Sequence, residues 1–181
     1  MTQVKPFIKC VDFWSNKIPK DKLEAYRQLC RENPKIKAIG EIGLDYFRSQ
    51  TSKEMQAYAF AAQLDVARQM HMPVSIHDRD AHGDCFETVL RYPGVRGVFH
   101  SYSGSAEMAT ELCRRGWFIS FSGTLTFTNA ARVREAARAV PRELLLVETD
   151  APYLAPHPMR GRPNHSGYLV HTLGVLAEIW D

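Results

Sequence analysis

The chain has 181 residues, of which 45% are hydrophobic and 24% are charged, and its formal net charge is +3. This composition predicts a globular protein with one well-buried core, and no apolar run reaches the ~18 residues that a membrane span requires. The four cysteines lie far apart and form no C-x-x-C pair, which favours reduced thiols in a cytoplasmic protein over a disulfide framework or a zinc finger. The charge is compatible with a phosphate-bearing partner but is lower than that of dedicated nucleic-acid binders.

Short apolar stretches alternate with longer segments of helical periodicity from one end of the chain to the other. In chain order, strands are predicted at 6–13, 35–43, 72–77, 94–100, 117–123 and 144–149. Each is followed by a predicted helix, at 19–32, 53–70, 82–91, 105–116, 129–140 and 166–181. Repeated strand–helix units predict an α/β fold, in which helical crossovers join parallel strands.

Two architectures fit this alternation, a doubly wound open sheet and a closed (β/α)8 barrel of about 250 residues. The chain contains no glycine-rich phosphate loop of the GxGxxG or GxxxxGK[ST] type, which disfavours the nucleotide-binding open sheets. It also shows no internal repeat and no linker, so residues 1–181 are predicted to form a single domain.

Four of the predicted strands lead into side chains that commonly bind metals. These are Glu41, His77, His100 and, after the last strand, Glu148 and Asp150. Each has an ordinary alternative role: a solvated carboxylate, a surface ion pair, a buried histidine bonded to a carbonyl, or a turn cap. Because the carboxyl ends of parallel barrel strands open at one mouth, their shared position favours a site for zinc, manganese or magnesium there.

Three stretches resemble the TatD-like metal-dependent deoxyribonucleases, a family of amidohydrolase-type TIM barrels. They are AIGEIGLDYFR (38–48), PVSIHDRDA (73–81) with GVFHSYSG (97–104), and PRELLLVETDAPYLAP (141–156) with RGRPN (160–164). The resemblance extends over about residues 35–175. It implies a (β/α)8 barrel of the metal-dependent hydrolase type that cleaves the phosphodiester bonds of DNA, single-stranded or frayed at its ends.

The resemblance also implies roles for individual residues. Glu41 would bridge two divalent cations, His77 and His100 would hold one of them, and Asp150 would hold the other and accept the proton of the attacking water. From residue type and position alone, Arg79 and Arg160 are candidates to bind phosphate oxygens and Tyr46 and Tyr102 to stack on bases, although core packing is the commoner fate of such tyrosines. Glu41 stands where related amidohydrolases often have a carboxylated lysine, which favours the nuclease branch. Neither a membrane nor an obligate protein partner is implied.

The chain departs from the family pattern at both ends. It has no H-x-H pair, which in the family supplies two ligands to the metal shared with Asp150, and its last helix stops early. We therefore expect an incomplete barrel of about six strand–helix units that lacks the first two strands, a fragment of a longer gene product. Such a chain would keep one metal position, with Glu41, His77 and His100 as ligands, and lose most affinity at the second.

Two hypotheses remain open at this stage. The first is a TatD-like nuclease that uses divalent cations, and the second is an impaired barrel fragment that binds metal or nucleic acid without turnover. An amidohydrolase that acts on a small cyclic amide or lactone is a weaker third.

Overall fold

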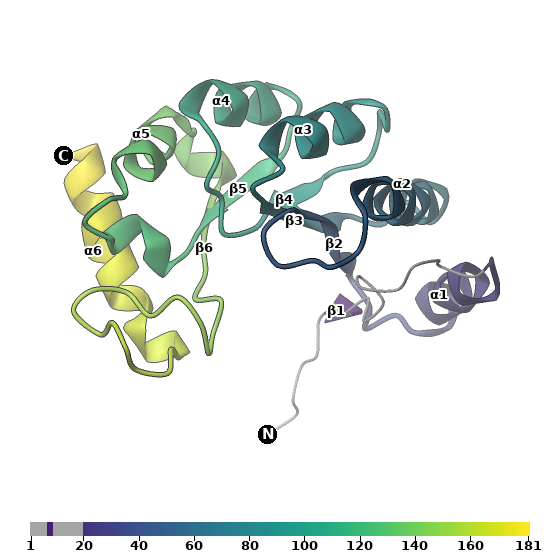
Figure 1. Cartoon of the computed structure of the whole chain (residues 1–181), viewed down its shortest axis with the longest axis horizontal. Helices are drawn as coiled ribbons and strands as arrows, with labels where there is room; N and C mark the ends of the chain where they lie inside the picture. The colour runs from purple at the N-terminus through teal and green to yellow at the C-terminus, as the bar shows by residue number, and fades with distance from the viewer. Residues whose placement is uncertain (1–6, 9–19) are drawn as a thin grey trace. The chain divides into compact units, whose positions relative to one another are not determined.

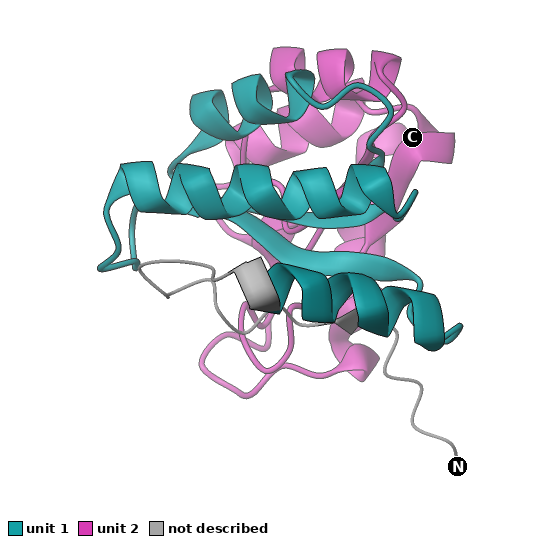
Figure 2. Ribbon diagram, turned by 90° about the vertical axis from the view of Figure 1, so that its right-hand side faces the viewer, with its two compact units in different colours: residues 1–97 teal, residues 98–181 magenta. Residues whose placement is uncertain are grey.

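The computed structural model describes residues 7–8 and 20–181. The chain divides into two compact units, residues 1–97 and residues 98–181, which Figure 2 shows in different colours. Of the first predicted strand, 6–13, only the pair Phe7–Ile8 is described, and it forms β1. The rest of that prediction lies outside the described residues.

Unit 1 contains parallel strands with helices that alternate with them, as predicted (Figure 1). In chain order its elements are β1 (Phe7–Ile8), α1 (Lys20–Glu32), β2 (Ala38–Asp45), α2 (Lys53–Gln69), β3 (Val74–Arg79) and α3 (His82–Leu90). Strand β2 pairs in parallel with both β1 and β3. Helix α2 begins at the cap residue Ser52, whose side chain accepts a hydrogen bond from the Met55 N–H.

The core of unit 1 forms where α2 packs against β2, which pairs with β3. The apolar residues of β2 are covered almost completely, and those of α2 recur at helical spacing. The side chains that are at most 2% exposed here include Ile39, Ile42, Leu44, Phe60, Leu64 and Ile76. Burial of this apolar surface stabilises the strand pair on which the candidate ligands lie.

Strands β2 and β3 lie slightly later in the chain than the sequence predicts. The predicted strand at 35–43 is observed at Ala38–Asp45, and the one predicted at 72–77 is observed at Val74–Arg79, so each continues past its candidate ligand. The glycines of AIGEIG indicated either a close backbone approach or a sharp exit, and the structure shows a close approach at Gly43, which lies inside the ladder directly opposite His77. A register shift between Ile39 and Ile42 places an additional β2 residue against β3, as in a β-bulge. Glu41 and His77 are therefore strand residues, not residues at strand ends.

Unit 2 continues the alternation. Strand β4 (Gly97–Phe99) begins at the last residue of unit 1, and α4 (Ala106–Arg114), β5 (Phe118–Phe121), α5 (Ala131–Ala139), β6 (Leu145–Val147) and α6 (Leu169–Trp180) follow. Three short 3-10 helices are η1 (Gly123–Thr126), η2 (Arg142–Leu144) and η3 (Ser166–Tyr168). Strand β5 pairs in parallel with both β4 and β6.

Aromatic rings form much of the core of unit 2. Phe99 packs edge-to-face against Trp117, with 5.4 Å between the ring centroids, and Tyr102 packs against Phe121 in the same way at 6.2 Å. Strand β6 is less covered than a fully buried strand, since Leu146 is 42% exposed. Within residues 7–8 and 20–181, no helix is both long and apolar enough to cross a membrane.

Candidate metal centre

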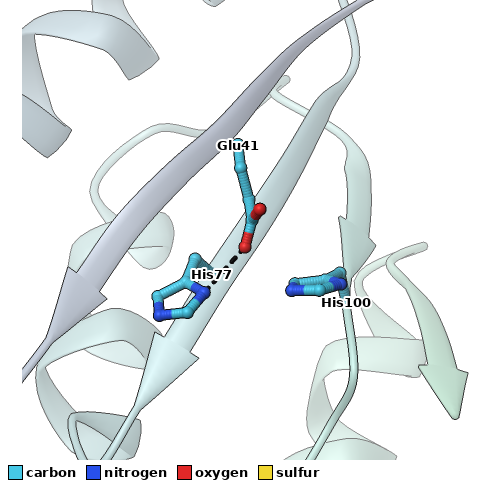
Figure 3. Close-up of side chains that lie close together, drawn as sticks. All are labelled: Glu41, His77 and His100. Atoms are coloured by element: carbon cyan, nitrogen blue, oxygen red, sulfur yellow. Dashed lines mark hydrogen bonds and ion pairs between the residues drawn. The ribbon is translucent and has the colours of Figure 1, made fainter. Parts of the chain in front are cut away.

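Glu41 and His77 lie on the neighbouring strands β2 and β3, and their side chains meet (Figure 3). The Glu41 Oε1 atom is 2.7 Å from Nδ1 of His77, and both side chains are half-buried. A carboxylate oxygen beside an imidazole nitrogen is a donor set that zinc and manganese accept. The pair therefore fits the metal-binding role that its residue types suggested.

The register of β2 and β3 explains this contact. His77 lies opposite Gly43, which has no side chain, and residues two positions either side of Gly43 share its face of the strand. Those residues are Glu41 and Asp45. The His77 ring spans the space over the glycine, so that Nδ1 reaches Glu41 and Nε2 lies 3.1 Å from Oδ2 of Asp45.

Asp45 is a member of the site that the sequence reading missed. Only 3% of the residue is exposed, and its Oδ1 atom accepts the backbone N–H groups of Phe47 and Arg48 at 3.0 and 2.7 Å. Burial acts to raise the pKa of this carboxyl, but these two hydrogen bonds and the contact with His77 outweigh it and leave the pKa below its usual value. The signal that could have found Asp45 is its strand spacing, two residues from Gly43 and four from Glu41.

A second aspartate–histidine pair lies beside the first. Nδ1 of His82, the first residue of α3, lies 2.8 Å from Oδ2 of Asp78, and the Asp78 Oδ1 atom accepts the backbone N–H of Ala81 at 3.3 Å. The His82 side chain is 24% exposed. This pair ties the start of α3 to the end of β3.

In unit 2, His100 directly follows β4 and contacts Glu148, which directly follows β6. Nδ1 of His100 lies 3.0 Å from Oε1 of Glu148. The same Oε1 atom accepts a short hydrogen bond from the Ser101 backbone N–H. Glu148 is thus held against His100, although the resemblance drew attention to Asp150 instead. Figure 3 labels His100 as well.

Asp150 lies in a loop that a single buried asparagine holds. The Asn164 side chain, 5% exposed, donates to the carbonyl oxygens of Thr149 and Tyr153 at 2.6 and 2.7 Å. Asp150 itself has a left-handed backbone with φ 56°, a conformation that aspartate tolerates better than most residues. The RGRPN segment therefore fixes the backbone on both sides of Asp150.

Two of the predicted substrate-binding residues have partners within their own unit. The Tyr46 hydroxyl donates to Asp84 at 2.6 Å, and the Lys53 ammonium lies 4.2 Å from the centroid of its ring. Arg160 donates to the Ala155 carbonyl at 3.0 Å and stacks on the Phe127 ring. Both side chains thus have structural roles of their own beside the predicted ones.

Arg79 lies beside an exposed aromatic ring. It is exposed at the end of β3, and its guanidinium lies 5.0 Å from the ring centroid of Phe47, which is 63% exposed. An exposed arginine beside an exposed ring offers one group for a phosphate and one for a base.

Tyr102 corrects the prediction made for it. The residue is 2% exposed, its hydroxyl donates to the Ser105 carbonyl at 2.7 Å, and its ring packs against Phe99 and Phe121. A ring enclosed in this way has no free face for a base. Tyr102 is a core residue, and stacking on a nucleobase is no longer assigned to it.

Comparison with known proteins places these residues in a family. The family model described as "TatD related DNase" matches residues 10–181. The chain is 43% identical over 166 residues to the uncharacterized metal-dependent hydrolase YcfH of Escherichia coli K12, a match that covers 86% of this chain and 62% of that protein. It is 40% identical over 165 residues to a protein of Klebsiella pneumoniae named 3'-5' ssDNA/RNA exonuclease TatD, with 86% and 61% covered.

A solved structure shows the same fold. The crystal structure of YjjV, a TatD homologue from E. coli, superposes with a TM-score of 0.81 at 32% identity and covers 90% of this chain and 64% of that one. The parallel strands and alternating helices are thus those of a TatD-type TIM barrel, and the α/β prediction is confirmed. The chain spans about three fifths of the length of the curated relatives it matches. On these matches, the chain belongs to the TatD-related DNase family.

Proposed function

We propose that this chain carries ligands of the divalent-metal site of a TatD-type hydrolase that cleaves phosphodiester bonds in nucleic acid. Glu41, His77 and His100 would hold one cation, and Asp150 together with Glu41 would hold a second. Manganese, magnesium and zinc are the candidate ions. The observation that carries the proposal is the contact of 2.7 Å between Glu41 Oε1 and His77 Nδ1, in a chain that matches the family model.

The chemistry of each ligand supports this assignment. Glu41, His77 and His100 are half-buried, a degree of exposure that leaves a polar side chain reachable while it weakens competition from water. His100 contacts Glu148 through Nδ1 and would bind the cation through Nε2. A bound divalent cation would supply Lewis acidity, which lowers the pKa of water and neutralises charge on the phosphate.

The remaining roles belong to residues of the protein. The Asp150 carboxylate would accept the proton that the attacking water loses. Arg79 would contact a phosphate oxygen, with the neighbouring Phe47 ring available to a base, and Arg160 and Tyr46 are further candidates for substrate contact. These contacts suit a single strand or a frayed end, whose bases are unstacked and accessible.

The name of the Klebsiella relative, an ssDNA/RNA exonuclease, supports a nucleic-acid substrate. Relatives named only as metal-dependent hydrolases support metal-dependent hydrolysis without naming a substrate. We therefore propose single-stranded DNA as the first substrate to test, with RNA of the same sequence beside it.

The test combines metal binding with hydrolysis. Calorimetric titration of the purified chain with Mn²⁺ and Zn²⁺ should show binding that Glu41→Gln and His77→Ala remove. The control variant Glu87→Gln makes the same change at an exposed position on α3, and it should bind Mn²⁺ and Zn²⁺ as the unaltered chain does. A 5'-labelled single-stranded oligonucleotide should be shortened only when a divalent cation is present, and Asp150→Asn should abolish this.

Other results would point elsewhere. Metal binding without shortening of the oligonucleotide under any of the three cations would favour a chain that binds metal without turnover. Equal metal binding by the unaltered chain and by Glu41→Gln would contradict the proposed site.

A further inference from the structure

His77 contacts two carboxylates, one on each side of its ring. Glu41 faces Nδ1 at 2.7 Å and Asp45 faces Nε2 at 3.1 Å, and the two acids lie on the same strand on either side of Gly43. A neutral imidazole carries one proton, and only the nitrogen without it can bind a cation. Which nitrogen carries that proton therefore decides whether His77 can act together with Glu41.

The two acids differ in how firmly they are held. Glu41 is half-buried, whereas Asp45 is 3% exposed and accepts two backbone N–H groups through a single oxygen, Oδ1. The backbone N–H of Asp45 itself donates to the Gln56 side chain at 2.8 Å. Its second oxygen, Oδ2, thus has a fixed position and faces Nε2 of His77.

We infer that Asp45 is a positioning residue, which keeps the proton of His77 on Nε2 and so directs the Nδ1 lone pair toward the cation shared with Glu41. A carboxylate behind a metal-binding histidine fixes both the tautomer and the orientation of the ring. The inference rests on the proposed function, in which His77 is a ligand, and it assigns to Asp45 no contact with the metal or the substrate.

The hydrogen bonds of Asp45 make Asp45→Asn a sharp test. The amide oxygen should occupy the Oδ1 position, because the N–H groups of Phe47 and Arg48 both need an acceptor there. The amide nitrogen then replaces Oδ2 and presents a donor to Nε2. His77 can accept this donor only when its proton moves to Nδ1, where it donates to Glu41 and blocks the metal position.

The structure offers a matched control in the same unit. Asp78 has the same arrangement as Asp45, with Oδ1 on a backbone N–H and Oδ2 on a histidine, but its partner is His82. Asp78→Asn therefore makes the same chemical change, from a carboxylate to an amide behind an imidazole, beside a histidine that is not a proposed ligand.

Three measurements test the inference. Long-range ¹H–¹⁵N spectra should show a proton on His77 Nε2 in the unaltered protein, with or without zinc, and none there in Asp45→Asn. Calorimetry should show Zn²⁺ bound about 10- to 100-fold more weakly by Asp45→Asn, the usual loss for such a partner, and with unchanged affinity by Asp78→Asn. Urea unfolding should leave Asp45→Asn close to the unaltered protein, and Asp45→Ala, which removes both backbone acceptors, clearly less stable.

The outcomes separate this inference from the proposed function. If the unaltered chain binds no zinc, the proposed function fails. The NMR measurement of the His77 Nε2 proton, in the unaltered protein and in Asp45→Asn, still decides whether Asp45 positions the His77 ring. If zinc binds but Asp45→Asn retains both full affinity and the Nε2 proton, the role of Asp45 is refuted while the metal site stands. An Asp45→Asn protein as unstable as Asp45→Ala would also refute the inference, because it assumes that Oδ1 alone holds the loop.

Discussion

Replacement of Gly43 by alanine is expected to disturb both the stability of unit 1 and the candidate metal site. Gly43 lies opposite His77 in the β2–β3 ladder, and its φ of 140° is one that side chains rarely adopt. A Cβ atom at this position would lie 2.0 Å from the carbonyl oxygen of His77. Because that oxygen belongs to the backbone, the clash cannot be relieved by a side-chain rotation.

The magnitude follows from two contributions. The unfavourable backbone conformation costs about 1–2 kcal/mol for a residue with a side chain. Displacement of β3 away from β2, as in overpacked cores, adds about 1–3 kcal/mol. Their sum of about 2–5 kcal/mol is a large part of the ~5–15 kcal/mol by which domains are usually stable. The same displacement moves His77 away from Glu41, so metal affinity should fall as well.

Two other glycines of unit 1 separate these contributions. Gly94 has a positive φ of 93° but no atom within 4 Å of an added Cβ, so alanine there should show only the backbone cost, about 1–2 kcal/mol. Gly83 lies in α3 with open space around an added Cβ, so alanine there should stabilise the protein by about 0.5–1 kcal/mol.

The assay is urea unfolding followed by circular dichroism, together with amide hydrogen exchange at Ile42 and Leu44. From most to least stable, the expected order is Gly83→Ala, the unaltered protein, Gly94→Ala and Gly43→Ala. In Gly43→Ala the β2 amides should also lose their protection from hydrogen exchange. A Gly43→Ala protein as stable as Gly94→Ala, with its β2 amides still protected, would refute the close approach of β2 and β3 at His77.

Three further predictions concern unit 2. Burial and the nearby Glu143 charge raise the pKa of the Cys113 thiol to about 11, so its alkylation at pH 8 should be about 100-fold slower than that of an ordinary thiol. The rate should still rise tenfold per pH unit up to pH 10, and a plateau near pH 9 would contradict this. Asn164→Ala removes both hydrogen bonds that hold the backbone beside Asp150, which should cost about 2–3 kcal/mol in unfolding experiments and slow oligonucleotide hydrolysis. Glu148→Gln should leave the proton of His100 on Nδ1, because the Oε1 atom of residue 148 contacts both His100 Nδ1 and the Ser101 N–H, and an amide oxygen can accept from both. NMR spectra of this variant that show the His100 proton on Nε2 would disprove the prediction.

The contrast between the two acids illustrates how an identical chemical change depends on local geometry. At Asp45, different oxygens face the backbone and the histidine, so an amide presents a donor to the ring. At Glu148, one oxygen faces both, so an amide can present its oxygen to both. Only the atomic arrangement distinguishes these cases, since each is simply an acid near a histidine in the sequence.

Much of the fold could be predicted because its signals are local. Helical periodicity and proline or glycine punctuation placed the six helices to within a few residues of their observed ends. The alternation of strands and helices identified the α/β class, and the motif around ETDAP indicated the family. Residue type and position were also enough to propose Glu41 and His77 as neighbours, and the structure brings them into contact.

The rest required the tertiary structure because it depends on contacts between strands. The sequence could indicate a close backbone approach or a strand exit at Gly43, but only the register shows that its missing side chain lets His77 lie across β2 and reach both Glu41 and Asp45. The sequence left base stacking and core packing open for Tyr102, and packing with Phe99 and Phe121 buries it in the core. The sequence alone determined the order of elements and the types of ligand, since these follow from local patterns. Register and burial arise only when distant segments pack together, and they decided which acid holds each histidine.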